Sequence, residues 1–300
     1  MLANYHTHTS RCGHARGTDR EYVERAIEAG FDVLGFSDHC PWVFSDGYVS
    51  GIRMRDTDVD GYFSSLTDLK KEYADDIKLY IGFEAEYIPA LIEAQDRLLA
   101  DYPLDYMIMG QHFNNPESCG VYMGVPTSDE GILREYVDRI IEGMDSGRYR
   151  YLAHPDLLDF TGSAEAYEEH YTRLCQFLKD KDIPVEINML GMMNNKHYPS
   201  ERFFRIAKKV GNKAIIGCDA HIPEFLNDSS IRKIGNAFAD WMKLELVESL
   251  SGLEGFDNRN CAQERDSKGT VFLWRSPEAA PLVGCGAKPR SYEGAPQRVN

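Results

Sequence analysis

Histidines and carboxylates recur in this chain at the ends of short apolar runs. His6 and His8 form a His-x-His pair at the end of the first run, and in an extended chain side chains two residues apart point the same way. The two imidazoles can therefore bind one metal ion. Later runs end in the same residue types, and one further histidine follows the first run: His14, His39, Glu84, His112, His154, Asp219 and His221.

This set predicts a metal centre with more than one ion. It comprises seven histidines, one glutamate and one aspartate, which exceeds the needs of a single tetrahedral zinc site. Imidazoles fill terminal positions and carboxylates can bridge two cations, so the set suits two or three divalent ions. The ligand types accept Zn, Mn, Fe or Co, and the identity of the metal stays open.

An isolated histidine is more often a structural or solvated residue than a ligand. The agreement of six predicted strand ends carries the interpretation, because chance would scatter histidines through helices as well. His170 and His197 do not fit the pattern. We expect His170 to be a solvated residue in the middle of a helix, and His197 to lie in a loop, at the surface or facing the substrate.

Strand-like runs alternate with helical patterns along most of the chain, which is typical of a parallel α/β architecture. In a parallel barrel the carboxyl ends of all strands lie on one face, where active sites are built. The spacing suits a closed barrel better than an open sheet. The runs cover residues 2–6, 32–37, 77–84, 106–112, 150–154, 184–188 and 214–219.

Three helices have recognisable ends in the sequence. Thr18 and Glu21 have capping-box spacing, and Gly30 stands where a helix would end. Thr127 and Glu130 repeat that spacing before another apolar pattern. Pro199 and Ser200 open a third helix, and Gly211 closes it.

The last fifty residues differ from the rest. Residues 251–300 are rich in glycine and proline and contain one strand-like run, 270–274. We therefore expect a catalytic domain over residues 1–250 and a C-terminal extension, an appendage or a poorly ordered end, over residues 251–300.

Composition restricts the partners of the protein. The net charge of −15 repels a nucleic-acid backbone, and no block of basic residues offsets it. No apolar run approaches the roughly 20 residues that a membrane-spanning helix needs, and the first ten residues show no export signal. The seven cysteines are scattered without a Cys-x-x-Cys pair, which fits a reducing compartment. We expect a cytoplasmic protein that binds neither nucleic acid nor membrane; the oligomeric state stays open.

Taken together, the motifs resemble those of the PHP (polymerase and histidinol phosphatase) superfamily, and most closely its histidinol-phosphatase branch. They are H-T-H-T (6–9), C-G-H-A (12–15), S-D-H (37–39), G-F-E-A-E-Y (82–87), Q-H-F (111–113), A-H-P-D (153–156), E-I-N (186–188) and C-D-A-H (218–221). The Met54–Arg55 pair and Tyr198–Pro199 after E-I-N point to that branch. The resemblance covers roughly residues 1–250 and implies a distorted, TIM-like (β/α)7 barrel with a trinuclear metal centre.

The resemblance also implies how the ligands divide among three ions. The first ion would be held by His6, His8, Glu84 and Asp219, and the second by Glu84, His112 and His154, with Glu84 bridging. The third would be held by His14, His39 and His221. Glu84, Asp219 and His221 would also take part in catalysis, with Asp219 or a ligand histidine passing a proton to the leaving group.

Candidate substrate contacts are less specific. Arg55 matches the family's position for a phosphate contact; Arg53, Arg16, Arg11 and Lys196 are weaker candidates, for which a solvated surface charge is the commoner outcome. The E-I-N motif adds Asn188 as a further candidate contact. Asp38, Asp156 and Glu86 stand beside ligands and would orient imidazoles, or Glu86 would face the amine of a cationic substrate.

The leading hypothesis is a metal-dependent phosphomonoesterase that hydrolyses histidinol phosphate in histidine biosynthesis. A second hypothesis is a PHP phosphoesterase for another small ester, such as a nucleotide or a sugar phosphate. A third is a metal-binding regulatory or structural module without turnover, and the intact set of ligands argues against it. A phosphate-release assay separates the third from the first two.

Overall fold

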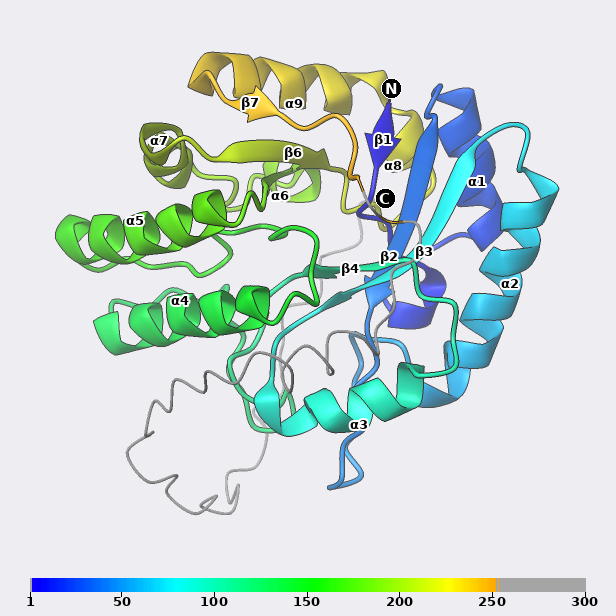
Figure 1. Ribbon diagram of the computed structural model, residues 1–300, viewed down its shortest axis with the longest axis horizontal. Coiled ribbons are helices and arrows are strands. Elements are labelled where there is room, and N and C mark those ends of the chain that lie inside the picture. Colours follow the sequence, from blue (N-terminus) through cyan, green and yellow to red (C-terminus); the bar gives the residue numbers. More distant parts are fainter. Residues whose placement is uncertain (1, 252, 254–300) are drawn as a thin grey trace, which may run out of the picture.

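The computed structural model describes residues 2–251 and 253, and Figure 1 shows a curled sheet in the middle with helices around it. The strands are β1 (Ala3–Asn4), β2 (Val33–His39), β3 (Lys78–Ala85), β4 (Tyr106–Met109), β5 (Val185–Asn188), β6 (Lys213–Gly217) and β7 (Glu245–Leu246). The α-helices are α1 (Asp19–Glu28), α2 (Val59–Glu72), α3 (Pro89–Leu99), α4 (Glu130–Asp145), α5 (Ala164–Asp180), α6 (Met189–Met193), α7 (Glu201–Val210), α8 (Glu224–Asn227) and α9 (Ser229–Met242). Two 3-10 turns complete the elements, η1 (Ser10–Cys12) and η2 (Asp56–Asp58).

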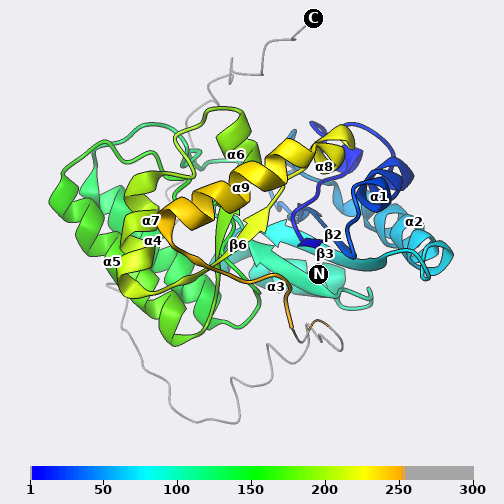
Figure 2. The same ribbon diagram turned by 90° about the horizontal axis from the view of Figure 1, so that it is seen from above.

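All paired strands are parallel. One sheet has the order β1-β2-β3-β4 and the other the order β5-β6-β7. Helices α1 and α2 flank the first sheet, while α4, α5 and α7 lie beside the second (Figure 1). Helices α8 and α9 lie on one side of the molecule, as Figure 2 shows. This arrangement confirms the predicted α/β class with a curled parallel sheet.

Single residues join the two sheets. Leu152 forms parallel bridges to Met109 at the end of β4 and to Val185 at the start of β5. At the other side Thr7 forms a parallel bridge to Ala220, and the Ala220 N–H donates to the His6 carbonyl at 3.2 Å. The predicted strand over 150–154 is thus reduced to one bridging residue among the described elements.

Two apolar cores lie on the two faces of the curled sheet. The larger core packs the helices against the outer side of the strands. The smaller core lies between the strands and consists of four tyrosines and five aliphatic residues: Tyr5, Val33, Tyr80, Tyr106, Ile108, Tyr151, Ala153, Ile215 and Leu253. Aromatic and β-branched side chains favour these strands because they fill the pleated surface.

The sequence signals for helix ends are confirmed at two of three helices. The Thr18–Glu21 capping box is present at α1, and α7 begins with Ser200 accepting from the Phe203 N–H and ends at Gly211 in the left-handed region. The predicted box at Thr127 is wrong. Asp129 caps α4 instead, because its carboxylate accepts from two backbone N–H groups of the first turn.

Other expectations need correction or lie outside the described residues. The prediction that His170 is a solvated helix residue is wrong: it is 7% exposed on the inner face of α5. Strand β7 was not expected, since its two residues give too short an apolar run. Of the predicted C-terminal extension, only residues 251 and 253 are described, so its run over 270–274 lies outside the described part. None of the helices in residues 2–251 is long and apolar enough to cross a membrane.

Candidate metal centre

The structure brings all nine predicted ligands together at the carboxyl end of the sheet. Strand register begins this convergence, because His39 at the end of β2 is directly opposite Glu84 on β3. The first and the last ligands along the chain are brought together by a backbone hydrogen bond, in which the His8 N–H donates to the Ala220 carbonyl at 2.9 Å. His6 and His8 therefore lie beside Asp219 and His221.

Glu84 occupies the middle of the cluster. Its Oε1 lies 2.6 Å from His154 Nε2 and 3.5 Å from His112 Nε2. Its Oε2 lies 3.1 Å from His39 Nδ1, 3.4 Å from His6 Nε2 and 3.5 Å from His8 Nε2. Each carboxylate oxygen thus faces a different group of imidazoles, which is the arrangement a bridging ligand needs.

Asp219 forms a second meeting point of ligands. Its Oδ1 lies 3.0 Å from His8 Nε2, 3.5 Å from His6 Nε2 and 3.4 Å from His221 Nδ1. Both Asp219 and His154 have positive φ angles, 55° and 27°. Residues other than glycine adopt this region at a cost in energy, and such strain is concentrated at functional sites.

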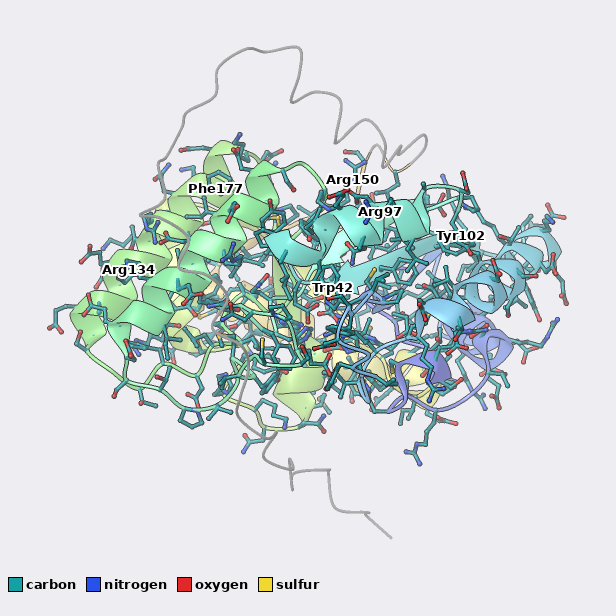
Figure 3. The ribbon with its side chains drawn as sticks, turned by 90° about the horizontal axis from the view of Figure 1, so that it is seen from below. Trp42, Arg97, Tyr102, Arg134, Arg150 and Phe177 are labelled. Atoms are coloured by element: carbon teal, nitrogen blue, oxygen red, sulfur yellow. The ribbon has the colours of Figure 1, made fainter. Side chains whose placement is uncertain are left out.

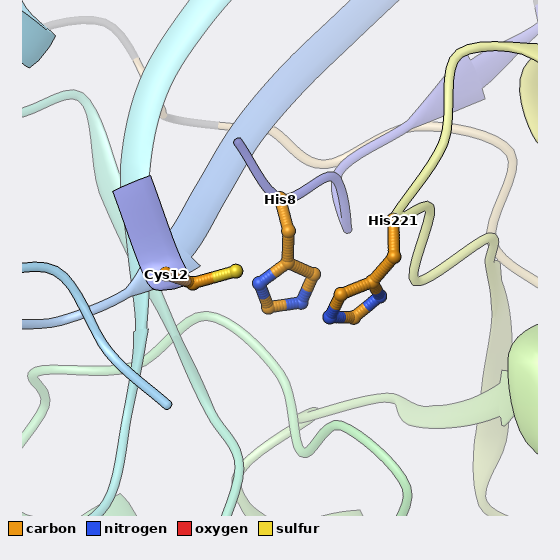
Figure 4. A group of neighbouring side chains, drawn as sticks. All are labelled: His8, Cys12 and His221. Atoms are coloured by element: carbon orange, nitrogen blue, oxygen red, sulfur yellow. The ribbon is translucent and has the colours of Figure 1, made fainter. Parts of the chain in front are cut away.

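A third group contains His14, His39 and His221, whose ligand atoms lie within 4.8 Å of one another. His14 Nε2 and His221 Nε2 are only 2.9 Å apart. The thiol of Cys12 also meets this distance criterion together with His8 and His221. In Figure 4 the sulfur points toward the His8 ring, and the His221 ring stacks on the far side of it, with ring centroids 4.1 Å apart.

The ligand side chains have buried atoms without a hydrogen-bond partner, and a divalent ion could bind these atoms. Among the described residues, three buried atoms that face one another in the centre have no hydrogen-bond partner: His6 Nε2, His8 Nε2 and Glu84 Oε2. Buried polar atoms are normally satisfied, and their concentration at one place calls for an absent partner. A cation that accepts lone pairs from imidazole and carboxylate would satisfy them.

Carboxylates lie behind the imidazoles and fix their orientation. His6 Nδ1 donates to Glu186 Oε1 at 2.8 Å, and His112 Nδ1 donates to Glu86 Oε1 at 3.2 Å. In both rings Nε2 is thereby left to face Glu84. This pairing of a carboxylate with a ligand histidine sets the tautomer and raises the basicity of the ligand.

Glu186 and Asn188 hold the opposite side of the centre. Glu186 Oε2 accepts from the His154 N–H at 3.0 Å and from Asn188 Nδ2 at 2.9 Å. Asn188 Nδ2 also donates to Asp219 Oδ2 at 3.0 Å, while its Oδ1 accepts from the Gly191 N–H. The amide of Asn188 is therefore occupied in positioning Asp219, rather than free for the substrate contact that we expected.

Two glycines make room for the carboxylates, Gly110 directly after β4, which pairs with β3, and Gly217 on β6, which pairs with β5. A Cβ at Gly110 would lie 1.8 Å from Glu84 Oε1, and a Cβ at Gly217 would lie 1.7 Å from Glu186 Oε1. Any side chain at these positions would displace a glutamate from the centre. The absence of a Cβ is therefore a requirement of the site.

Mutual electrostatics divide the histidines into two classes. Burial alone would lower the pKa of His8, but the carboxylates of Asp219 and Asp38 raise it to about 9. The pKa of His6 is likewise raised, because Glu186, Asp219 and Glu84 outweigh its burial. Burial and the positive charge on His8 instead lower the pKa of His221 to about 3 and that of His39 well below its usual value.

The carboxylates stay ionised within this cluster. Burial would raise the pKa of Glu84, but the neighbouring imidazoles of His112 and His6 hold it well below the usual range. His6 and His8 do the same for the pKa of Asp219. The centre is thus an anionic core surrounded by imidazoles, which can exchange their protons for a metal ion.

The expected substrate residues separate into buried and exposed ones. Arg53 is 3% exposed and donates to both oxygens of Glu86, at 3.1 and 2.9 Å, and to Glu117 Oε2 at 2.7 Å. Glu86 also accepts from Trp42 Nε1 at 3.1 Å, so it has no free oxygen to face an amine. We therefore infer that Arg53 and Glu86 position other side chains of the site rather than bind the substrate. Figure 3 shows Trp42 in the middle of the molecule.

Two arginines remain available for a phosphate group. Arg55 and Arg16 are exposed, and a backbone hydrogen bond ties the segment of each to a ligand: Met54 N–H donates to the His39 carbonyl, and Arg16 N–H donates to the His221 carbonyl. The other two candidates, Arg11 and Lys196, differ. Arg11 forms a bidentate pair with Asp19, and Lys196 is exposed on the loop before α7.

The remaining polar residues named from the sequence have separate roles. Asp38 accepts from the His39 N–H at 2.8 Å and lies 3.5 Å from His8 Nδ1, which fits an orienting role. Asp156 accepts from the Ser200 N–H and connects its loop to the start of α7. The loop position of His197 is confirmed, and its Nε2 lies 2.7 Å from the Leu157 carbonyl.

Comparison with known proteins decides the family. Residues 4–189, more than half of the chain, match the family model of the PHP domain. The chain belongs to the PHP family. It is 32% identical over 249 residues to a probable histidinol-phosphatase of Schizosaccharomyces pombe, which covers 74% of this chain and 81% of that protein. This likeness places the chain in the histidinol-phosphatase branch of the PHP family.

Two further PHP relatives extend the comparison. A probable histidinol-phosphatase of Deinococcus radiodurans is 27% identical over 250 residues, covering 81% of this chain and 92% of that protein. The crystal structure of histidinol phosphate phosphatase from Lactococcus lactis, complexed with zinc, L-histidinol and phosphate, superposes with a TM-score of 0.65. That pair is 20% identical over 84% of this chain and 97% of the other, which shows a shared fold.

The sequence interpretation missed three residues that support the ligands. Glu186, Trp42 and Glu117 all contact residues named from the sequence, but none of them ends a strand-like run. For Glu186 a signal existed: it precedes Asn188 by two residues on β5, so both side chains point to the same face. Glu117 carries no local signal, since it lies in a loop.

Proposed function

We propose that this protein is a histidinol-phosphatase, a metal-dependent phosphomonoesterase that releases phosphate from histidinol phosphate. The observation that carries the proposal is the cluster of nine ligands around Glu84, in a chain of the PHP family whose relatives are named histidinol-phosphatases. The function places the protein in histidine biosynthesis.

The ligands divide into three proposed metal sites. His6, His8, Asp219 and Glu84 hold the first ion, and Glu84 with His112 and His154 holds the second. His14, His39 and His221 hold the third. Divalent ions there would supply positive charge to the phosphoryl oxygens and acidify a water molecule.

The chain's own residues bind and orient the ester. Arg55 and Arg16 bind the phosphate oxygens, because both are exposed and follow ligand-bearing segments. Asp219 or a ligand histidine such as His221, whose Nδ1 lies 3.4 Å from Asp219 Oδ1, would take the proton that the attacking water gives up and pass it to the leaving alkoxide. Asn188 keeps Asp219 in place through its 3.0 Å hydrogen bond.

The fold that carries the site is proposed to be a distorted (β/α)7 barrel. Residues 151–153 are hydrogen-bonded on both sides: Met109 N–H donates to the Tyr151 carbonyl, and Glu186 N–H donates to the Leu152 carbonyl. Residue 152 then takes the place of a fifth strand, and the Thr7–Ala220 bridge closes the circuit.

The setting of the enzyme follows from charge and thiols. A small ester is the substrate rather than a nucleic acid, because the net charge of −15 repels polyanions. Four buried cysteines, Cys12, Cys40, Cys175 and Cys218, are free thiols, which supports a cytoplasmic location.

A second candidate is a phosphatase for another small ester. It is favoured by one observation: Glu86, the carboxylate expected to face an amine, is already bound by Arg53, Trp42 and His112. An enzyme that recognises only the phosphate group would accept several esters.

A phosphate-release assay tests both candidates. Metal-depleted protein is reloaded with Zn²⁺ or Mn²⁺ and given histidinol phosphate, glycerol phosphate and a nucleoside monophosphate. The proposal expects kcat/KM for histidinol phosphate to exceed the others by at least about tenfold. Equal rates would favour the broader phosphatase, and no release from any ester would contradict both.

A further inference from the structure

The segment 41–55 crosses the carboxyl end of the sheet, and we call it the strap. Its first contact is Trp42, whose indole N–H donates to Glu86 Oε2 at 3.1 Å. Its far end returns to β2, where the Met54 N–H donates to the His39 carbonyl at 3.3 Å. Between these points the carbonyl of Gly51 lies against Gly13, next to His14. The strap therefore contacts segments that carry three of the proposed ligands.

One carboxylate outside the metal centre holds the strap. Glu117, in the loop after β4, accepts from three strap residues: Tyr48 O–H at 2.9 Å, Ser50 O–H at 2.8 Å and Arg53 Nε–H at 2.7 Å. Its side chain is only 7% exposed. A buried carboxylate with three donors from one segment is a strong anchor, because charge-assisted hydrogen bonds are about twice as strong as neutral ones.

The same anchor is connected to a ligand of the metal centre. The guanidinium of Arg53 donates to Glu117 through Nε–H and to Glu86 through both terminal nitrogens. Glu86 in turn accepts from His112 Nδ1 at 3.2 Å. The planar guanidinium therefore fixes the distance between Glu117 and Glu86, and with it the ring of His112.

The strap also carries the exposed arginine assigned to phosphate. Arg55 stands two residues after Arg53, at the start of η2, and no side-chain contact is described for it. Its placement depends on the backbone that Arg53 holds and that the Met54 N–H ties to the His39 carbonyl. Loss of the anchor would leave both Arg55 and the orientation of His112 less well defined.

From this geometry we propose that Glu117 is a positioning residue. It holds the strap 41–55 over the metal centre through Arg53, and so places Arg55 for the phosphate group and His112 for its ion. The phosphate part of this inference rests on the proposed function. The contact between Glu117 and the strap does not.

The test compares two isosteric substitutions. Glu117→Gln removes the charge at the anchor, and Glu72→Gln removes it from a surface pair in which Arg20 contacts both carboxylate oxygens at 2.6 Å. Hydrogen exchange of peptides covering 41–55 is measured on the metal-loaded protein. We expect exchange there to rise about tenfold in Glu117→Gln and to stay unchanged in Glu72→Gln. Unchanged exchange in Glu117→Gln would overturn the proposal.

Binding of inorganic phosphate, followed by calorimetry, tests the positioning role without any ester. We expect the dissociation constant to rise about tenfold in Glu117→Gln. With a hydrolysed ester, KM should rise by a similar factor while kcat stays within about twofold. A lower melting temperature with unchanged phosphate affinity would show a merely structural role and contradict the proposal.

A milder double variant keeps the test valid if Glu117→Gln fails to fold. Tyr48→Phe with Ser50→Ala removes two donors and leaves the ion pair of Arg53 and Glu117 intact. We expect an intermediate rise in exchange of the strap, with phosphate affinity reduced about threefold. No change in either measurement would count against Glu117 as the anchor.

Discussion

The two ends of the space between the strands have opposite chemistry. At the amino end the side chains are tyrosines and aliphatic residues, and Leu253 closes the space. At the carboxyl end the same strands present histidines, Glu84 and Glu186, with several buried atoms unsatisfied. One end therefore contributes to the stability of the protein, and the other reserves its polar atoms for a ligand.

Glycine serves both ends in the same way. A Cβ at Gly82 would lie 2.5 Å from the ring of Tyr106, just as a Cβ at Gly110 would overlap Glu84. At each end, the glycine therefore leaves space for one large side chain, Tyr106 or Glu84. Substitutions at matched positions should separate effects on stability from effects on metal binding.

The largest effect is expected at the centre of the ligand cluster. Glu84→Gln should abolish turnover and lower the metal content, because an amide gives one neutral oxygen where two cations share an anion. Elemental analysis and the phosphate assay check this. Tyr106→Phe is the control at the amino end, where the phenol donates to the Tyr5 carbonyl at 2.8 Å. Full metal loading of the Gln variant would remove Glu84 from its bridging role.

The matched glycines should come next. Gly110→Ala should lower metal affinity about 10- to 100-fold, since the new methyl group displaces Glu84. Gly82→Ala should leave the metal content of the folded protein unchanged and lower the free energy of unfolding by about 1–3 kcal/mol through overpacking. Metal titration and denaturant unfolding of both variants measure the two quantities. Equal loss of metal affinity in both would show that the ends are not independent.

The closing residue of the amino end should affect stability alone. Leu253 is 2% exposed, so Leu253→Ala should lower the free energy of unfolding by about 2–5 kcal/mol. Phosphate release should persist at temperatures where the variant is folded. A chain ending after residue 253 is the companion test, and it should retain the stability that a chain ending at residue 248 loses.

The smallest expected effect is the release of protons when the metal binds. In the metal-free protein the raised pKa of His8, about 9, and that of His6 keep both imidazoles protonated at pH 7. Metal binding must displace these protons, so affinity should rise with pH up to about 9. Calorimetry in two buffers of different ionisation enthalpy measures the release. Binding without proton release at pH 7 would contradict the raised values.

The sequence predicted the ligands better than their supports. Each ligand ends a strand or follows one, so strand order alone brings His6, His39 and Glu84 to one face. The supports depend on contacts between loops. The side chain of Glu117 meets Arg53, 64 residues away in sequence, and no local pattern encodes that contact.

Element boundaries show the same division. The long apolar runs predicted β2 and β3 nearly in full. The strand predicted over 150–154 is present only as a single bridging residue, Leu152. The short pairing at Leu152, between the two sheets, depends on the neighbouring segments that bridge to it on each side. Helix α4 is capped by Asp129 rather than Thr127, because the Asp129 carboxylate accepts from two backbone N–H groups.

The meeting of His8 with Ala220 has a consequence for how the protein is made. The proposed first ion draws on His6 and His8 near the start of the chain and on Asp219 more than two hundred residues later. Contacts between such distant residues form late in folding, because a long loop must close first. During synthesis the ribosome must therefore release residue 219 before that site exists. We expect the two sheets to form without metal, and the ions to enter a nearly finished protein rather than to guide its assembly.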